Sequence, residues 1–322
     1  MPQKPQPPRV LDTPDDLRLQ SERWRAAGMT VGLVPTMGAL HDGHRTLLAR
    51  AREECDRVVA SIFLNPTQFG RGEDLTRYPR PLDRDLAMLA AQRIDAAFVP
   101  AVEAMYPEGA HTTVHVGGPL AERFEGEHRP GHLDGVATVV AKLLVAARPD
   151  RAYFGEKDAQ QLAVVRRLAR DLDTGVEIVA CPLLRDSDGL ALSSRNAYLS
   201  PDDRAQALAI PRGLAAAASM WAAGERRADR LVEAIRAELD RSPAIAPEYV
   251  AVVDQDTFAE VTEAAKGCRI VLAGRMSAAR LIDTIRLGYD EVPAVAGGSG
   301  AAAERSNPTP GPAEWSSPCS AS

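Results

Sequence analysis

The sequence predicts an α/β protein in which a parallel sheet domain is followed by a smaller α+β domain. In the first half of the chain, short apolar runs alternate with longer amphipathic segments, as expected for strands that alternate with helices. Strands connected in this way form a parallel sheet with helices on both faces. After residue 184 the pattern changes to a helix-rich segment followed by strand-like runs.

The expected elements follow the chain in order. Strands are expected at short apolar runs, namely residues 31–34, 58–64, 94–99, 152–154 and 176–181, and at the half-exposed run 112–116. Helices are expected at 14–27, 45–55, 82–92 and 159–172, and a buried helix is expected at 135–147, which is apolar all round. The second domain is expected to contain helices within 202–241 and strands at 249–253, 269–273 and 281–287.

These elements divide the chain into four parts. Residues 1–10 are polar and Pro-rich and are expected to form a flexible leader. Residues 11–184 should form the sheet domain, and residues 185–290 the smaller domain that covers it. Residues 291–322 are rich in Ala, Gly, Ser and Pro. We expect this tail to be disordered, because it cannot bury enough apolar surface to offset its ordering entropy.

Composition and charge exclude several classes of partner. The 322 residues carry a formal net charge of −6, whereas a nucleic-acid-binding protein needs a basic surface. No apolar run approaches the roughly 20 residues of a membrane helix, and the N-terminus lacks the apolar segment of a signal peptide. The four cysteines are scattered without zinc-site spacing. We therefore expect a cytoplasmic protein that acts on small molecules, without nucleic acid or a membrane as partner.

The stretch VGLVPTMGALHDGH, residues 31–44, contains the strongest candidate site. An apolar strand is followed by a Pro/Gly loop and by a helix that begins near His41 and His44. A helix N-terminus offers unpaired N–H groups and a partial positive charge, which suit a phosphate. Gly43 would let a ligand approach the backbone closely. Two histidines at such a position can equally be ordinary structural residues, so the other motifs must decide.

The combination of strand, loop, H-x-G-H and helix resembles the phosphate-handling motif of the nucleotidyltransferase superfamily, whose fold is Rossmann-like. The longer stretch PTMGALHDGH resembles the first motif of the pantothenate synthetase (pantoate–β-alanine ligase) family. This resemblance implies an ATP-dependent ligase that forms a C–N bond between pantoate and β-alanine. The reaction would pass through a pantoyl adenylate and release AMP and pyrophosphate. The resemblance also implies Mg²⁺ and a homodimer.

Three further motifs resemble the family in the same order along the chain. They are FLNPTQF at 63–69, FGEKDAQQ at 154–161 and LALSSRN at 190–196. Each also has a structural interpretation: an Asn-Pro turn, a solvated surface lysine, and a Ser-rich turn that caps the next helix. A fourth stretch, EGEHRPGHLDGV at 125–136, resembles a family segment in which Glu125, Arg129 and His132 would support the site or a dimer contact.

The resemblance assigns roles to residues at the matching positions. The catalytic group comprises His41, His44, Lys157, Ser193, Ser194 and Arg195. Residues that would bind ATP are Pro35, Thr36, Met37, Gly38, Gly43, Gly155, Asp158, Leu184 and Leu192. Pantoate and β-alanine would be bound by Asn65, Gln68 and Gln161. Asp85 is the candidate ligand of Mg²⁺.

Some positions depart from the family pattern and leave alternatives open. Arg84 and Met88 stand where the family tends to have a second acid and, in some members, a glutamine, which leaves only Asp85 for the metal. Ala159 and Leu192 replace an aromatic residue and a methionine. One alternative is another adenylyl transferase of the same superfamily, which transfers AMP to a phosphate. The other is a catalytically weakened homologue, suggested by Arg84 and Met88.

Overall fold

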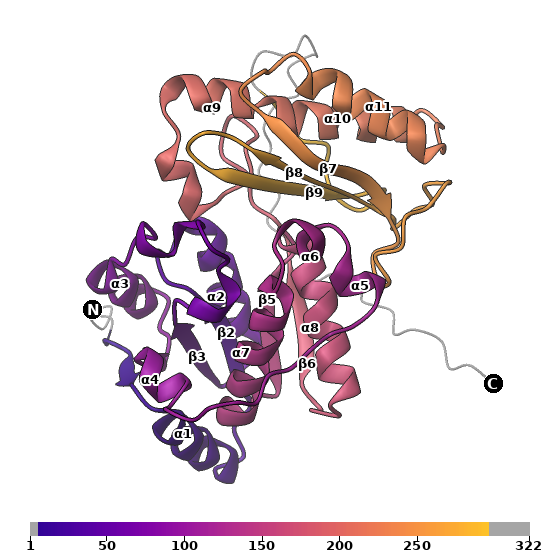
Figure 1. The fold of residues 1–322 in the computed structure, drawn as a ribbon. Helices are drawn as coiled ribbons and strands as arrows, with labels where there is room; N and C mark the ends of the chain where they lie inside the picture. Colours follow the sequence, from indigo (N-terminus) through magenta and orange to yellow (C-terminus); the bar gives the residue numbers. More distant parts are fainter. Residues whose placement is uncertain (1–5, 296–322) are drawn as a thin grey trace, which may run out of the picture.

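The computed structural model describes residues 6–295 as two layered lobes, with the strands β7, β8 and β9 lying above the larger lobe in Figure 1. The larger lobe contains a six-stranded sheet in the order β1-β4-β3-β2-β5-β6, and every pairing in it is parallel. Its strands are β1 (Arg9–Leu11), β2 (Val31–Thr36), β3 (Arg57–Ile62), β4 (Ala96–Phe98), β5 (Arg151–Gly155) and β6 (Glu177–Cys181). This is the predicted Rossmann-like α/β architecture.

The strand order creates a switch point between β2 and β5. The chain builds outward from β2 through β3 to β4 and later returns to place β5 on the other side of β2. Loops that follow the two strands therefore diverge and leave a crevice at their carboxyl ends. Open α/β sheets bind their ligands at such a point.

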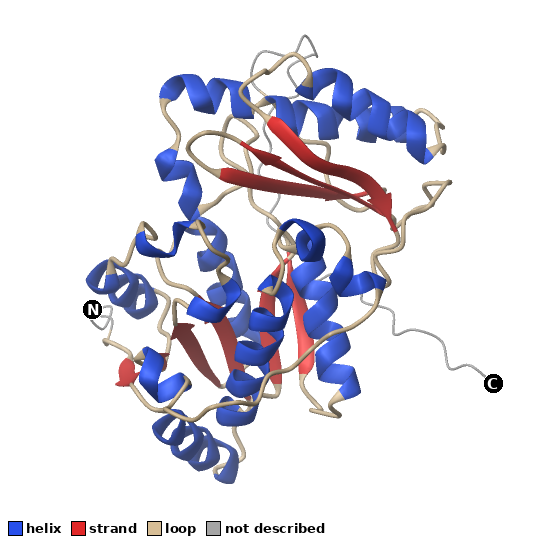
Figure 2. Cartoon of the chain, in the orientation of Figure 1, coloured by secondary structure: helices blue, strands red, loops and turns tan. Residues whose placement is uncertain are grey.

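Helices cover both faces of the parallel sheet (Figure 2). One face packs against α1 (Pro14–Ala26), α7 (His132–Ala147) and α8 (Ala159–Asp171). The opposite face packs against α2 (Asp42–Glu54) and α3 (Leu82–Ala91). Side chains of a strand point alternately to the two faces, so both must be apolar, which explains the continuous apolar runs of the buried strands.

The smaller lobe packs helices on one face of an antiparallel sheet. Its strands are β7 (Ala246–Val253), β8 (Arg269–Arg275) and β9 (Arg280–Arg286), and its helices are α9 (Pro201–Ala207), α10 (Ala209–Ala222) and α11 (Ala228–Leu239). Ile270 and Leu272 on one face of β8 pack among these helices. Val271 on the other face packs with Phe124 and Ala163 of the larger lobe, so the sheet is buried on both sides.

Short helical turns complete the chain, and two details correct the sequence predictions. The turns are η1 (Pro66–Gln68), η2 (Asp74–Thr76), α4 (Val102–Met105), α5 (Pro119–Glu122), α6 (Glu125–His128) and η3 (Ser194–Tyr198). The strand predicted at 112–116 is wrong: Val114 N–H donates to the hydroxyl of Thr138 on α7 instead of to a neighbouring strand. The leader predicted over 1–10 is too long, because Arg9 already begins β1 at the sheet edge. Residues 1–5, and the predicted tail from 296 onward, lie outside the described residues.

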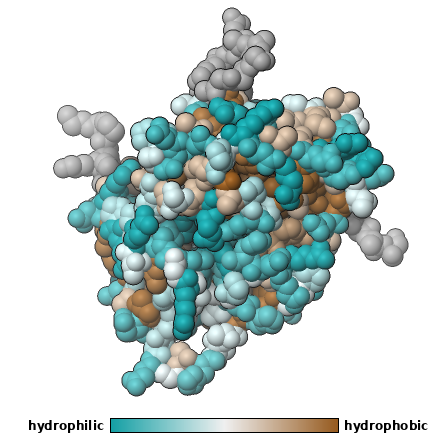
Figure 3. Space-filling view, turned by 45° about the horizontal axis from the view of Figure 1, so that its top comes forward, coloured by the Kyte–Doolittle hydropathy of each residue, from teal (hydrophilic) through white to brown (hydrophobic). Residues whose placement is uncertain are grey.

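The face shown in Figure 3 is mostly hydrophilic, with small groups of hydrophobic residues scattered over it. Over residues 6–295, no helix is both long enough and apolar enough to cross a membrane.

Candidate active site

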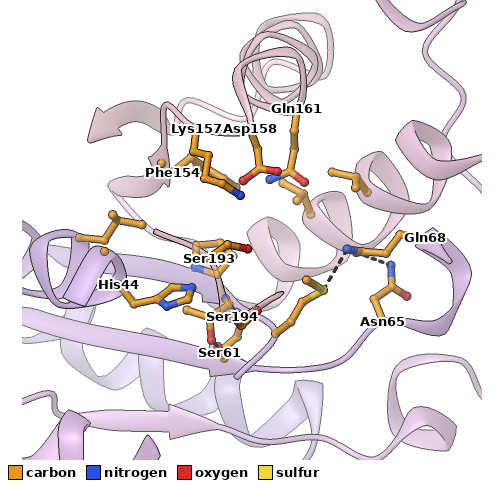
Figure 4. Close-up of a pocket in the computed structure, with 18 of the residues that line it drawn as sticks. His44, Ser61, Asn65, Gln68, Phe154, Lys157, Asp158, Gln161, Ser193 and Ser194 are labelled. Carbon is orange, nitrogen blue, oxygen red and sulfur yellow. Dashed lines mark hydrogen bonds between the residues drawn. The ribbon is translucent and has the colours of Figure 1, made fainter. Parts of the chain in front are cut away.

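A cavity of about 220 Å³ lies at the carboxyl ends of β2 and β5, at the switch point of the sheet. Figure 4 shows side chains from distant parts of the chain turned toward this space: His44 from one side, Lys157 and Asp158 from another, and Gln68 opposite. Of the predicted site residues, the cavity is lined by Pro35, Thr36, Met37, His41, Gly43, His44, Asn65, Gln68, Gly155, Lys157, Asp158, Gln161, Leu184, Leu192, Ser193, Ser194 and Arg195. Gly38 and Asp85 are not part of this lining.

The two histidines hold each other at the start of α2. His41 is the N-cap, and its Nδ1 accepts a hydrogen bond from the N–H of Gly43 at 3.1 Å. His44 Nδ1 in turn accepts from the N–H of His41 at 3.2 Å. Each ring therefore uses Nδ1 as an acceptor and carries its proton on Nε2 when neutral. Both Nε2–H groups are left to donate to a ligand.

Burial keeps these histidines uncharged. It lowers the pKa of His44 to about 3, with the neighbouring His41 and Lys157 acting in the same direction. Burial and the charge of Lys157 also lower the pKa of His41. Both rings are therefore neutral hydrogen-bond donors near pH 7. Before an anion binds, His44 does not carry the extra proton that it would need to act as a general acid.

Glycine is needed at position 43 because the ring of His41 occupies the space that a side chain would take. A Cβ at this position would lie 2.8 Å from Cε1 and 3.0 Å from Nδ1 of His41. The ring of His41 covers the backbone of Gly43, and that contact permits the Nδ1 hydrogen bond. The spacing H-x-G-H thus encodes a histidine cap in addition to open backbone for a ligand.

Asp85 lies under the loop that follows β2. Its carboxylate accepts 2.8 Å hydrogen bonds from the N–H groups of Ala39 and Leu40, and its residue is 1% exposed. Burial, only partly opposed by these bonds, raises the pKa of Asp85. Gly38 belongs to the same loop, and its N–H donates to the hydroxyl of Thr36. The visible role of Asp85 is to hold the loop, and its role as a metal ligand stays a prediction.

At the opposite end of the cavity, Gln68 is held in a fixed place. Its Oε1 accepts from Asn65 Nδ2 at 3.1 Å, and its Nε2 donates to Met37 Sδ at 3.1 Å (Figure 4). Because a thioether is a weak acceptor, a carboxylate or hydroxyl can replace it. Asn65 also donates to Gly135 O and accepts from the hydroxyl of Tyr106. Its amide is thus occupied within the protein, as in the Asn-Pro turn interpretation.

Lys157 provides a cation without a bound partner. The residue follows β5, and residues 6–295 make no hydrogen bond or ion pair with its ammonium group. Figure 4 shows its side chain reaching into the cavity beside Asp158, with Gln161 one turn further along α8. A solvated surface lysine would point away from the cavity. The position of Lys157 instead suits a phosphate.

Arg195 already has a partner that the sequence analysis missed. Its Nε and Nη2 each donate to Asp74 at 2.9 Å, and the ring of Tyr78 lies 5.8 Å from its guanidinium carbon. Ser194 shares a 3.0 Å hydrogen bond with the hydroxyl of Tyr78. Ser193 caps η3 by accepting from the N–H of Arg195, as the turn interpretation predicted, while it also lines the cavity.

The polar loop 70–81 therefore contributes one wall of the site. Neither Asp74 nor Tyr78 was predicted, because a loop without periodicity gives no sign of what it contacts. The only available signal was composition, since an aromatic residue and two acids stand in a short Gly-containing loop. Arg129 and His132, expected to have a supporting role, also line the cavity.

The fold and the site together define a Rossmann-like α/β protein with a basic ligand cavity at the switch point of its sheet. The chain belongs to the pantoate–β-alanine ligase family, because the sequence model of that family matches residues 9–286.

Relatives and solved structures agree with this assignment. The pantothenate synthetase of Rubrobacter xylanophilus is 52% identical over 278 residues, covering 84% of this chain and 95% of that protein. The crystal structure of pantothenate synthetase from Thermus thermophilus superposes with a TM-score of 0.82 at 48% identity, covering 86% of this chain and 99% of that one. A structure of pantoate-beta-alanine ligase from Francisella tularensis, complexed with beta-gamma ATP and beta-alanine, gives a TM-score of 0.71 at 31% identity, covering 87% and 97%.

Proposed function

We propose that this chain is an AMP-forming ligase that condenses pantoate with β-alanine at the expense of ATP. One observation carries the proposal: a single cavity presents the Nε2–H donors of His41 and His44 and the unpaired ammonium of Lys157 at one end, and the amide of Gln68 at the other. A carboxylate is a poor acyl donor, because its leaving group would be oxide. Transfer of AMP to the acid removes that obstacle.

In the first step, a carboxylate oxygen of pantoate attacks the α-phosphorus of ATP, and the bond to pyrophosphate breaks. No protein nucleophile is needed, so the site must align the reactants and stabilise charge on the phosphates. We assign His41 and His44 to hydrogen bonds with phosphate oxygens, and Lys157, Ser193 and Ser194 to the leaving pyrophosphate. Arg195 joins them if the triphosphate displaces or shares its contact with Asp74.

The nucleoside part of ATP would lie against backbone and apolar groups around β2, β5 and the following loops. We assign this part of the site to Pro35, Thr36, Met37, Gly43, Gly155, Asp158, Leu184 and Leu192, which line the same cavity. Gly38 would contribute through the shape of its loop, because its N–H is already bound to Thr36.

In the second step, the amine of β-alanine attacks the acyl carbon of the adenylate. The C–N bond forms, the bond to AMP breaks so that AMP leaves with the bonding electrons, and the proton lost by the amine passes to water. Since the pKa of His44 is lowered to about 3 by burial, we assign this histidine to hydrogen bonding rather than to donating a proton. A bound phosphate would raise that pKa, because an opposite charge favours the imidazolium.

We assign the pantoate subsite to Gln68 and Gln161, with Asn65 holding Gln68 in place. Amides can donate to a carboxylate and exchange hydrogen bonds with hydroxyls, and pantoate carries both groups. The weak contact between Gln68 and Met37 leaves the Gln68 donor available.

Magnesium would enter with the nucleotide. Among residues 6–295, no group of three or more His, Cys, Asp or Glu side chains could hold a metal ion, and both oxygens of Asp85 accept backbone hydrogen bonds. Mg²⁺ usually keeps phosphate and water oxygens as most of its ligands. We therefore treat MgATP as the substrate and derive no step from a metal site built by the protein.

Two further features belong to this proposal. We place the enzyme in the cytoplasm, where the buried, unpaired thiols of Cys55, Cys181 and Cys268 would stay reduced. We also keep the homodimer implied by the family resemblance, which sedimentation velocity of the purified chain would test.

The decisive experiment measures AMP release from MgATP and pantoate, with and without β-alanine, in the wild type and in His44→Ala. We expect AMP release to require β-alanine and to fall by about 10²–10³-fold in the variant, as for loss of a preorganised donor. His111→Ala, at an exposed histidine, is the matched control and should keep wild-type activity. Dinucleotide formation without β-alanine would indicate another adenylyl transferase, and ATP binding without turnover would indicate a weakened homologue.

A further inference from the structure

A chain of buried charged side chains leads from the smaller lobe toward the cavity. It begins at Arg280 on β9, whose Nη1 and Nη2 donate to the two oxygens of Glu125 at 2.9 and 2.6 Å. The side chains of these residues are 13% and 9% exposed. The hydroxyl of Tyr249, on β7, adds a 2.6 Å hydrogen bond to Glu125. Strands β7 and β9 of the smaller lobe thus each provide a side chain that donates hydrogen bonds to the carboxylate of Glu125 in the larger lobe.

The chain continues from Glu125 to the backbone of Gln68. Arg129 Nη1 lies 3.4 Å from Glu125 Oε2 and 2.9 Å from Nε2 of His132. A guanidinium can only donate, so His132 must accept at Nε2 and carry its proton on Nδ1. That proton is donated to the carbonyl oxygen of Gln68 at 2.9 Å. We call Arg280, Glu125, Arg129 and His132 the interdomain relay.

The ionisation of the relay agrees with this direction of hydrogen bonds. Burial, followed by the charge of Arg129, lowers the pKa of His132 to about 4, so its ring is neutral. Burial opposes the charge of Glu125, but the bonds and charge of Arg280, with Arg129, outweigh it and lower the pKa of Glu125 to about 2. Arg129 also donates to Glu73 through Nε and Nη2, at 2.8 Å each. Loss of Arg280 would leave Glu125 with Arg129 and Tyr249 as its partners, and we expect Glu125 to draw Arg129 away from its present contacts.

We propose that Arg280 and Glu125 are positioning residues for the acid-binding amide of Gln68. Through them, the position of this amide depends on the position of the smaller lobe. The inference rests on the proposed function, in which Gln68 binds pantoate. The smaller lobe contributes no side chain to the lining of the cavity beyond the loop ending at Arg195. The relay gives it an indirect effect on the acid end of the cavity, where His132 contacts the backbone of Gln68.

The chain contains a matched pair of arginines for testing this proposal. Arg275 and Arg280 lie directly opposite each other on β8 and β9, and both bind Glu248, at 2.7 Å in each case. Only Arg280 also binds Glu125. Arg280→Gln and Arg275→Gln therefore make the same chemical change in the same hairpin, and only the first interrupts the relay.

The experiment determines KM for pantoate, KM for ATP and kcat in both variants, together with the wild type and the thermal unfolding of each. We expect Arg280→Gln to raise KM for pantoate about tenfold, the effect of losing one charge-assisted contact, with KM for ATP changed less than about twofold. Arg275→Gln should leave both constants near the wild type. Arg280→Lys keeps the charge but not the two-pronged contact and should fall between.

Tyr249→Phe keeps the proposal testable if Arg280→Gln does not fold, because it removes one hydrogen bond to Glu125 and no charge. It should raise KM for pantoate by about threefold. An unchanged KM for pantoate in folded Arg280→Gln or Tyr249→Phe, or an equal rise for ATP, overturns the relay while the ligase activity of the wild type stands. A wild type that releases no AMP with both substrates overturns the proposed function and the relay together.

Discussion

Gly135 on α7 offers a sharp test of how the acid end of the cavity is built. A Cβ at Gly135 would lie 2.4 Å from the carbonyl oxygen of Thr67, 2.6 Å from its carbonyl carbon and 2.7 Å from Gln68 Cα. All of these are backbone atoms, which cannot turn aside as a flexible side chain can. Gly135→Ala must therefore push α7 and the Thr67–Gln68 peptide apart by about 0.6 Å to restore a 3.0 Å separation.

The expected magnitudes follow from that displacement. Overpacking costs about 1–3 kcal/mol, and the better helix propensity of Ala returns about 1 kcal/mol, so the net loss of unfolding free energy should be about 1–2 kcal/mol. The midpoint of thermal unfolding should fall by about 2–4 °C per kcal/mol for a chain of this size. Displacing Gln68 should raise KM for pantoate by about 10–100-fold, since misplacement of about 1 Å can cost 10². KM for ATP should stay within about twofold of the wild type.

Gly213→Ala is the matched control for these measurements. Gly213 also lies in a helix, and a Cβ there would come within 3.0 Å of Ile235 Cγ2 and 3.2 Å of the Ile235 backbone, in the core of the smaller lobe. It should lower thermal stability without changing KM for pantoate. If Gly135→Ala loses stability but binds pantoate normally, or if both variants weaken pantoate equally, the close approach of α7 does not set the position of Gln68.

Two further predictions concern pH and the metal. Because burial and Arg129 lower the pKa of His132 to about 4 from 6.5, the unfolded chain takes the proton first as pH falls. The free energy of unfolding of the wild type should drop by up to about 2 kcal/mol between pH 6.5 and 5, as measured by urea titrations. The drop should be smaller in His132→Asn, and an equal drop in the two proteins would contradict the assignment. Asp85→Asn should lose about 1–3 kcal/mol through a mismatched backbone donor. The Mg²⁺ concentration that gives half-maximal activity should be the same in Asp85→Asn as in the wild type. A clear rise in that concentration would identify Asp85 as a metal ligand.

Much of the fold could be predicted because it depends on local pattern. Buried parallel strands appear as apolar runs and their helices as one-sided stripes, so the runs at 31–34 and 176–181 lie within β2 and β6 or overlap them closely. The ends of elements depend on caps that periodicity does not reveal: α2 begins at Asp42, three residues before the predicted helix, because His41 caps it. The strand predicted at 112–116 failed because alternation of side chains does not reveal whether a neighbouring strand exists.

The candidate site divides in the same way. The residues of H-x-G-H, GEKD and LSSRN were recognisable from the sequence because these motifs resemble those of a known family, in the same order along the chain. Tyr78 and Asp74 were not, because they stand in an aperiodic loop. The roles given to all of these residues remain predictions until the variants are measured.

The sequence by itself determined the α/β class and most of the central strands and helices, and its resemblance to the family indicated the motif residues that line the cavity. Only the tertiary structure decided which donors are free: Lys157 is unpaired within the described chain, whereas Arg195 is bound to Asp74, 121 residues away. It also decided that the His41 and His44 rings present Nε2–H groups, and that Arg280 reaches Glu125 across the two lobes. The physical reason is that protonation and pairing depend on burial and on distances between residues far apart in the chain, which local patterns do not encode.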